Sequence, residues 1–167
     1  MLFYYKKLGK ELEVLSDLIK INNDRIAGYQ LALDQTPDID IDLQEVFKKI
    51  IADSKYFKQQ LSQKLNETDG DTRKKATTIL GKIYKAWMDL KVAFSYSTQK
   101  AIISSCMYNE EIALHAYKAA LSTNTGIPAE IRQTIEEQAN ALSKVYYMLK
   151  KYHDVKVVMN HRLVYFN

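Results

Sequence analysis

Apolar side chains recur at alternating spacings of three and four residues along four long stretches of the chain. In the first stretch, from about Tyr4 to Asp34, they are Leu12, Leu15, Ile19, Ile26, Tyr29 and Leu33. This spacing gathers side chains on one face of an α-helix. The same pattern covers about residues 42–67, 98–122 and 128–153. It predicts four amphipathic helices, each of which buries one face.

The three later stretches carry equally regular apolar positions. In chain order they are Leu43, Phe47, Ile50, Phe57, Leu61 and Leu65, then Ile103, Cys106, Ala113, Tyr117 and Ala120, then Ile131, Ile135, Leu142, Val145, Leu149 and Tyr152.

Turn-forming residues separate the four stretches. Pro37 follows the first, Gly70 the second, and Gly126 precedes Pro128 at the start of the fourth. Asp40 or Asp42 is suited to cap the second helix. The longest connection, 71–80, is polar and leads to a predicted short helix over 81–94. We expect the apolar tail, 154–167, to extend the fourth helix, pack on the bundle or form a subunit contact.

Four long helices joined mostly by short loops predict an all-α, up-and-down four-helix bundle. Only 5 glycines and 2 prolines occur in 167 residues, too few for the many turns of a sheet protein. The longer second connection makes the layout ferritin-like, because ferritin-like bundles carry one long crossover. We expect one domain over 1–167, with the core bundle at about 10–153.

Charge and cysteine content narrow the classes of function. The net charge is +4, and basic residues occur only as short scattered runs, which disfavours a nucleic-acid partner. No apolar run reaches the length of a membrane span, and residues 1–10 lack the apolar core of a secretory signal. The single cysteine, Cys106, excludes a disulfide framework. We therefore expect a cytoplasmic protein that contacts neither nucleic acid nor membrane.

A polar residue interrupts each apolar stripe. The interruptions are Asn22, Ser54, Glu110 and Gln138. In antiparallel register they could meet in one internal layer. A buried Glu110 would then need hydrogen-bond donors, for which Asn22, Gln138, Arg25 or a tyrosine hydroxyl are suited. Such a layer either fixes helix register or is the remnant of a ligand site.

The sequence lacks the signature of a ferritin-like di-metal site. Such sites need Glu-x-x-His on two helices, and no histidine here follows a glutamate by three residues. Glu111 and His115 are four residues apart and, with Glu110, are the only speculative metal ligands. A surface pair is the simpler interpretation of Glu111 and His115. No catalytic or cofactor-binding residue is assigned, and buried Cys106 is not expected to be a nucleophile.

Three segments together resemble a known family. They are residues 17–29, DLIKINNDRIAGY; residues 81–91, GKIYKAWMDLK; and residues 127–132, IPAEIR. They are similar to the uncharacterised bacterial ferritin-like four-helix-bundle family called domain of unknown function 2383, over about residues 10–153. Family members often carry Glu where this chain has Gln60 and Met107, and His-Asp where it has Tyr146-Tyr147; Glu110 is retained. The resemblance thus implies a bundle whose polar or metal site, if the family has one, is depleted here.

Two hypotheses of function follow. The first is a non-catalytic bundle that has a structural or protein-interaction role and associates with itself. The apolar tail and the 12 tyrosines support this hypothesis. The alternative is a ferritin-like stress-response protein that holds iron or another divalent metal at a degenerate site near Glu110. The sequence favours the first hypothesis. On that hypothesis the protein has no cofactor and is not an enzyme.

Overall fold

The computed structural model describes residues 2–38, 40–68, 99–122 and 127–164. These residues form four α-helices: α1 (Leu2–Asp34), α2 (Ile41–Thr68), α4 (Gln99–Ser122) and α5 (Ala129–Val164). No strand occurs among them, which confirms the predicted all-α four-helix bundle. The short helix predicted over 81–94 lies outside the described residues.

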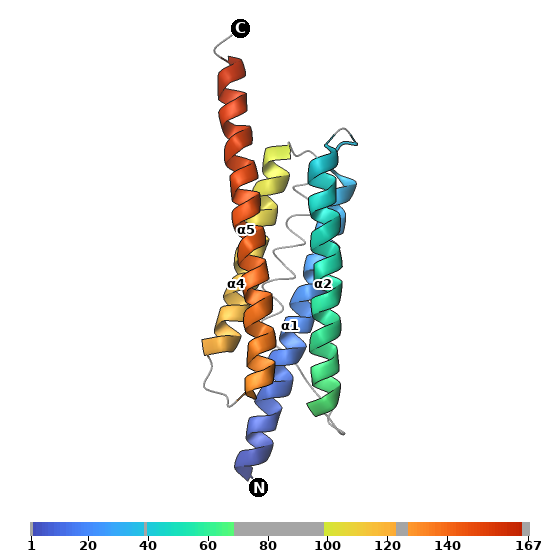
Figure 1. Cartoon of the computed structure of the whole chain (residues 1–167), viewed down its shortest axis with the longest axis vertical. Coiled ribbons are helices and arrows are strands. Elements are labelled where there is room, and N and C mark those ends of the chain that lie inside the picture. The colour runs from blue at the N-terminus through green and yellow to red at the C-terminus, as the bar shows by residue number, and fades with distance from the viewer. Residues whose placement is uncertain (1, 39, 69–98, 123–126, 165–167) are drawn as a thin grey trace.

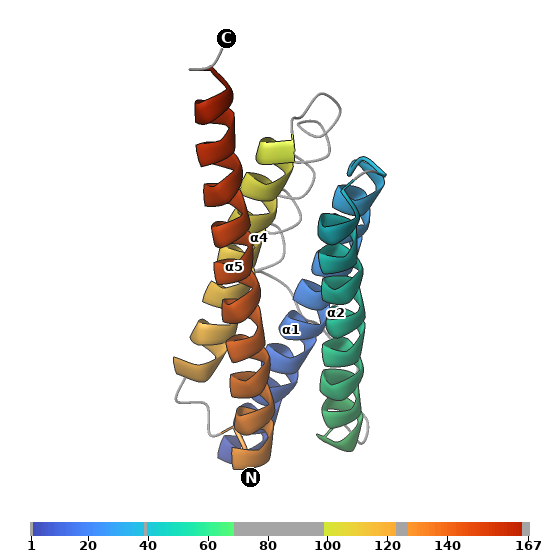
Figure 2. The same cartoon turned by 45° about the horizontal axis from the view of Figure 1, so that its top comes forward.

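The helices form two antiparallel pairs that lie side by side (Figures 1 and 2). α1 packs mainly on α2, and α4 mainly on α5, while α1–α4 and α2–α5 contacts join the two pairs. All neighbouring helices are antiparallel, whereas α2 and α4 run in the same direction (Figure 1). α2 therefore ends at the end of the bundle opposite to the start of α4.

Side chains fix the junction between α1 and α2. The Thr36 hydroxyl donates to the Ala32 carbonyl at 2.7 Å, and the Leu43 amide donates to Asp40 Oδ1 at 3.2 Å. Asp40 is thus the residue that caps α2, and Asp42 lies in the first turn. The Tyr152 hydroxyl from α5 also contacts the Asp40 carboxylate, at 2.9 and 3.0 Å from its two oxygens. This contact ties the α1–α2 junction to α5.

Buried apolar side chains form two clusters. One holds Leu15, Leu18 and Ile21 of α1 with residues 113–120 of α4 and the first half of α5. The other holds Tyr29 of α1 with residues 43–51 of α2 and 102–106 of α4. Along α1, α2 and α4, the residues between the clusters include the polar interruptions of the stripes.

The buried face of α1 differs from the predicted stripe. Leu12, Ile19, Ile26 and Leu33 are only half-buried, and Leu18, Ile21, Arg25 and Ala32 are buried instead. The buried face of α1 is turned toward Arg25, because the ion pair of Arg25 with Glu110 of α4 places this charged residue in the core.

α5 continues well past the predicted end near residue 153. It has 36 residues and reaches Val164, so residues 154–164 of the apolar tail extend the fourth helix, as one of the three expectations had it. Figure 1 shows this end of α5 projecting beyond the start of α4. Within the described ranges, no helix combines the length and apolarity that crossing a membrane requires.

Candidate functional site

The centre of the bundle holds a polar network to which all four helices contribute. Asn22 (α1), Ser54 (α2), Glu110 (α4) and Gln138 (α5) are each 0–1% exposed. Arg25 of α1 joins them and is 2% exposed. The four polar residues that interrupt the stripes therefore lie together in the core.

Arg25 and Glu110 form a buried ion pair across the α1–α4 contact. Arg25 Nε donates to Glu110 Oε1 at 2.9 Å, and Nη2 donates to Oε2 at 3.2 Å. This forked arrangement matches a planar guanidinium to a planar carboxylate. Arg25 thus neutralises the negative charge of Glu110 in the core, where water does not solvate it.

The third nitrogen of Arg25 ties the ion pair to α2. Nη1 donates to Ser54 Oγ at 2.9 Å, and Ser54 in turn donates to the Ile50 carbonyl at 2.7 Å. Nη1 also lies 3.4 Å from Asn22 Oδ1 on its own helix. One guanidinium therefore contacts α1, α2 and α4 at once.

A second arm of the network leads from Asn22 toward α5. Asn22 Nδ2 donates to the Tyr117 hydroxyl at 2.6 Å, and that hydroxyl donates to Gln138 Oε1 at 2.7 Å. Gln138 Nε2 then donates to Gln60 Oε1 at 3.0 Å. Burial raises the pKa of Tyr117 to about 12, so its proton stays in place at neutral pH.

Cys106 and Tyr29 lie near Glu110, and both stay in their neutral, protonated forms. Burial, followed by the charge of Glu110, raises the pKa of the Cys106 thiol far above its usual value of 9.0. The same two causes, in the same order, raise the pKa of Tyr29 well above 10.0. Both groups therefore remain protonated at neutral pH, and Cys106 lacks the thiolate form that a nucleophile requires.

The speculative metal ligands are not brought together. Glu110 is buried in the core, whereas Glu111 and His115 are exposed. Successive helical residues point about 100° apart, which explains why Glu110 and Glu111 face different environments. Across the described residues, no group of three or more His, Cys, Asp or Glu side chains is placed to hold a metal ion.

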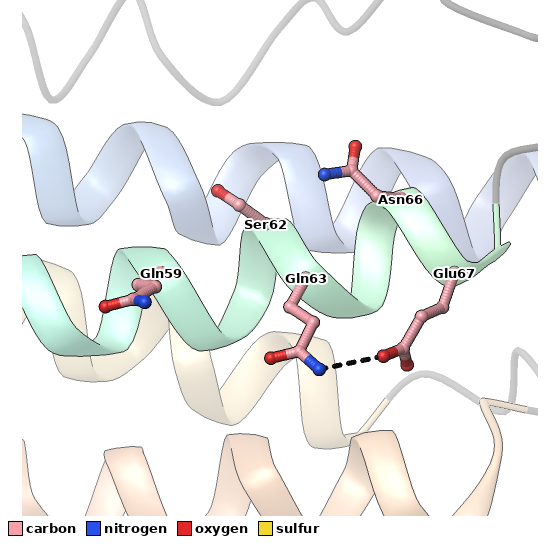
Figure 3. Close-up of a pocket in the computed structure, with 5 residues that line it drawn as sticks. All are labelled: Gln59, Ser62, Gln63, Asn66 and Glu67. Atoms are coloured by element: carbon pink, nitrogen blue, oxygen red, sulfur yellow. Dashed lines mark hydrogen bonds between the residues drawn. The ribbon is translucent and has the colours of Figure 1, made fainter.

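Surface depressions lie along α2 and between α4 and α5. One, of about 450 Å³, lies along α2 and is lined by Gln59, Ser62, Gln63, Asn66 and Glu67. Figure 3 shows these side chains, with Gln63 donating to Glu67 at 2.9 Å. All five come from one helix and are exposed or half-buried amides, a hydroxyl and a carboxylate. The second, of about 200 Å³, lies between α4 and α5.

The sequence signal for the central network is uneven. The interruptions of the stripes point to the first four members, and the need of Glu110 for donors points to Arg25 and to a tyrosine. Gln60 carries no such signal, because it lies off the stripe of α2 and is half-buried. Its part in the network depends on the position of Gln138 on α5.

Comparison with known proteins identifies the family of the chain. No curated protein matches the chain. The model of the family described as domain of unknown function (DUF2383) matches residues 10–123. The match covers the first two of the three similar segments and ends before residues 127–132 and α5. With most of its length matched, from α1 to the end of α4, the chain belongs to the DUF2383 family.

Proposed function

We propose that this protein is a non-catalytic, ferritin-like helical bundle that acts by binding protein, in the first place a second copy of itself. The observation that carries the proposal is the outer face of α5. Tyr147, Met148 and Val155 are 65%, 41% and 50% exposed there. Large apolar side chains that gather on an exposed face favour an interface, and Tyr and Met are enriched at interfaces.

Met148 and Val155 fall on one side of the helix, because they are seven residues apart, which is two helical turns. Tyr147 lies about 100° around the helix from Met148 and widens the exposed surface. α5 also projects past the start of α4 (Figure 1). A projecting helix with an apolar side is suited to pack against a second helix of the same kind.

The ferritin-like part of the proposal is supported by the helix directions. α2 and α4 run parallel, and all helices in contact run antiparallel (Figure 1). Ferritin-like bundles, in which one long crossover links the two hairpins, share this arrangement.

The Arg25–Glu110 pair disfavours the alternative function, a degenerate di-metal site. A divalent ion at Glu110 would have to displace a guanidinium that contacts both carboxylate oxygens and would leave that cation buried without a partner. Oxygen-ligated divalent sites also use several carboxylates, and Glu110 is the only carboxylate that the described residues contribute to the network.

Sedimentation of the full chain over a range of concentrations tests self-association. We expect the wild-type protein to form dimers or larger assemblies, and Val155→Glu and Met148→Glu to shift them toward monomer. The matched control is Gln133→Glu, the same change of charge at an exposed position of α5, about 22 Å from Met148 along the helix. A wild-type protein that stays monomeric at every concentration, or a control that dissociates equally, contradicts the proposal.

Metal analysis tests the alternative directly. The protein is purified without chelators, its Fe, Mn and Zn content is measured, and the melting temperature is compared with and without each added metal. Stoichiometric metal together with a rise in melting temperature that Glu110→Gln abolishes would overturn the non-catalytic assignment.

A further inference from the structure

The groove between α4 and α5 gathers side chains that the central network does not use. It has a volume of about 200 Å³ and is lined by Ser104, Met107, Tyr108 and Glu111 of α4 with Tyr146 and His153 of α5. The lining therefore combines two phenol rings, a thioether, a carboxylate and an imidazole. Its volume is below the 300–1,000 Å³ of sites for drug-sized ligands, so it fits one small group.

The aromatic wall of the groove is built from neighbouring tyrosines. Tyr108 is 57% exposed, so its ring is open to a ligand. Tyr146 is half-buried and packs edge-on against Tyr147, with ring centroids 5.5 Å apart and an interplanar angle of 77°. This contact restrains the Tyr146 ring before anything binds.

Glu111 brings a carboxylate to the groove. In the part of the chain that the structure describes, Glu111 forms neither an ion pair nor a side-chain hydrogen bond. Another exposed acid of the bundle does have such a partner: Glu45 pairs with Lys48 at 2.8 Å. An ionised carboxylate that lines the same groove as two electron-rich rings makes the groove attractive to a cation.

We infer that this groove is a binding site for an organic cation, namely an alkylammonium group. The ring faces of Tyr108 and Tyr146 and the sulfur of Met107 contact the alkyl part, and Glu111 balances the charge. A bare metal ion fits poorly, because Glu111 is the only carboxylate among the described residues of the lining. The group is either a free amine or a lysine side chain of a protein, which share this chemistry. The inference is independent of self-association.

The first experiment compares ligands that differ only in charge. The full-length protein is titrated with choline and, separately, with its neutral isostere 3,3-dimethylbutan-1-ol, and amide shifts are followed by NMR. A second pair, a lysine tripeptide and its norleucine analogue, distinguishes a protein-borne cation from a free one. We expect saturable shifts centred on residues 104–111 and 146–153 with at least one cationic ligand, and none there with its neutral partner.

Matched variants then test the assigned residues. Glu111→Gln and Tyr108→Ala should each weaken binding about two- to fivefold, the range for exposed cation–π contacts. The controls are Glu136→Gln, an exposed acid of α5, and Tyr56→Ala, a tyrosine that is also 57% exposed. Because all four positions are exposed, circular dichroism should report intact helices.

Several results would overturn the inference. They are no saturable shift with either cation, equal binding of the neutral partner, shifts centred elsewhere, or equal losses in the control variants. Equal binding of the neutral partner would make the groove a site for apolar groups. Sedimentation is measured on the same variants, and we expect it to be unchanged, so failure of this inference is separable from failure of self-association.

Discussion

Replacing Arg25 by methionine should destabilise the protein severely. Arg25→Met preserves much of the aliphatic volume but leaves Glu110 in a site that is 0% exposed, without its cation. Removal of one partner of a buried ion pair costs about 3–5 kcal/mol. Because domains are stable by about 5–15 kcal/mol, this is a large fraction of the total free energy of unfolding.

Urea unfolding followed by circular dichroism measures the effect. With a urea m value of about 1–3 kcal/mol/M, the midpoint should fall by at least about 1 M. The second variant, Arg25→Met with Glu110→Leu, removes both charges and should recover most of the loss, since buried ion pairs exchange with apolar groups at little net cost.

A control variant at an exposed ion pair tests whether the loss depends on burial. Lys49 and Asp53 lie 2.6 Å apart, yet the Lys49 side chain is 74% exposed, so Lys49→Met should cost no more than about 0.5 kcal/mol. A loss below about 1 kcal/mol for Arg25→Met would refute the reasoning. So would a double variant whose loss equals the sum of the losses of Arg25→Met and Glu110→Leu alone.

Three further predictions concern single side chains. Tyr117→Phe removes the hydroxyl that links Asn22 to Gln138, and it should lower the free energy of unfolding by about 1–3 kcal/mol in the same urea assay, whereas exposed Tyr147→Phe should change it little. Burial raises the pKa of Asp24 above its usual 3.8, so its ionisation favours unfolding. Below pH 3.8 that penalty is absent, and it develops as the pH rises through the native pKa; Asp24→Asn should therefore raise the melting temperature at pH 7 more than at pH 3, and an equal gain at both would contradict this sign. Cys106 should resist a thiol reagent in native buffer and react fully in denaturant, because burial raises its pKa and encloses it; rapid native labelling would show that the core opens readily.

The periodicity of the chain predicts three of the four buried faces well. Glu110, Ala113 and Tyr117 of α4 follow the predicted stripe and are buried, and so do Leu43 and Leu61 of α2. On these helices the residues that pack against the neighbours are mostly the apolar residues of the stripe, so hydrophobic spacing predicts the buried face. α1 differs because the position of its inner face depends on a charged residue, Arg25, which a hydrophobic pattern assigns to solvent.

The sequence indicates the central network but not the groove between α4 and α5. Isolated polar residues within apolar stripes indicate the central network, since a polar group in a core needs partners. The groove residues Tyr108 and Glu111 lie outside the stripes and have no such signal. They become neighbours of Tyr146 and His153 only through the packing of α4 on α5, which sequence spacing within one helix does not specify.

The Arg25–Glu110 pair lies at the contact between the two hairpins, and this has a consequence for assembly. Each hairpin carries one half of the pair, so neither can bury its inner face alone without also enclosing an uncompensated charge. A foreign apolar helix in place of either hairpin would bury that charge without supplying an opposite charge to pair with it. A hairpin from another copy of the chain, however, brings the correct residue at the correct depth, so exchange between identical molecules is tolerated where intrusion by unrelated helices is not.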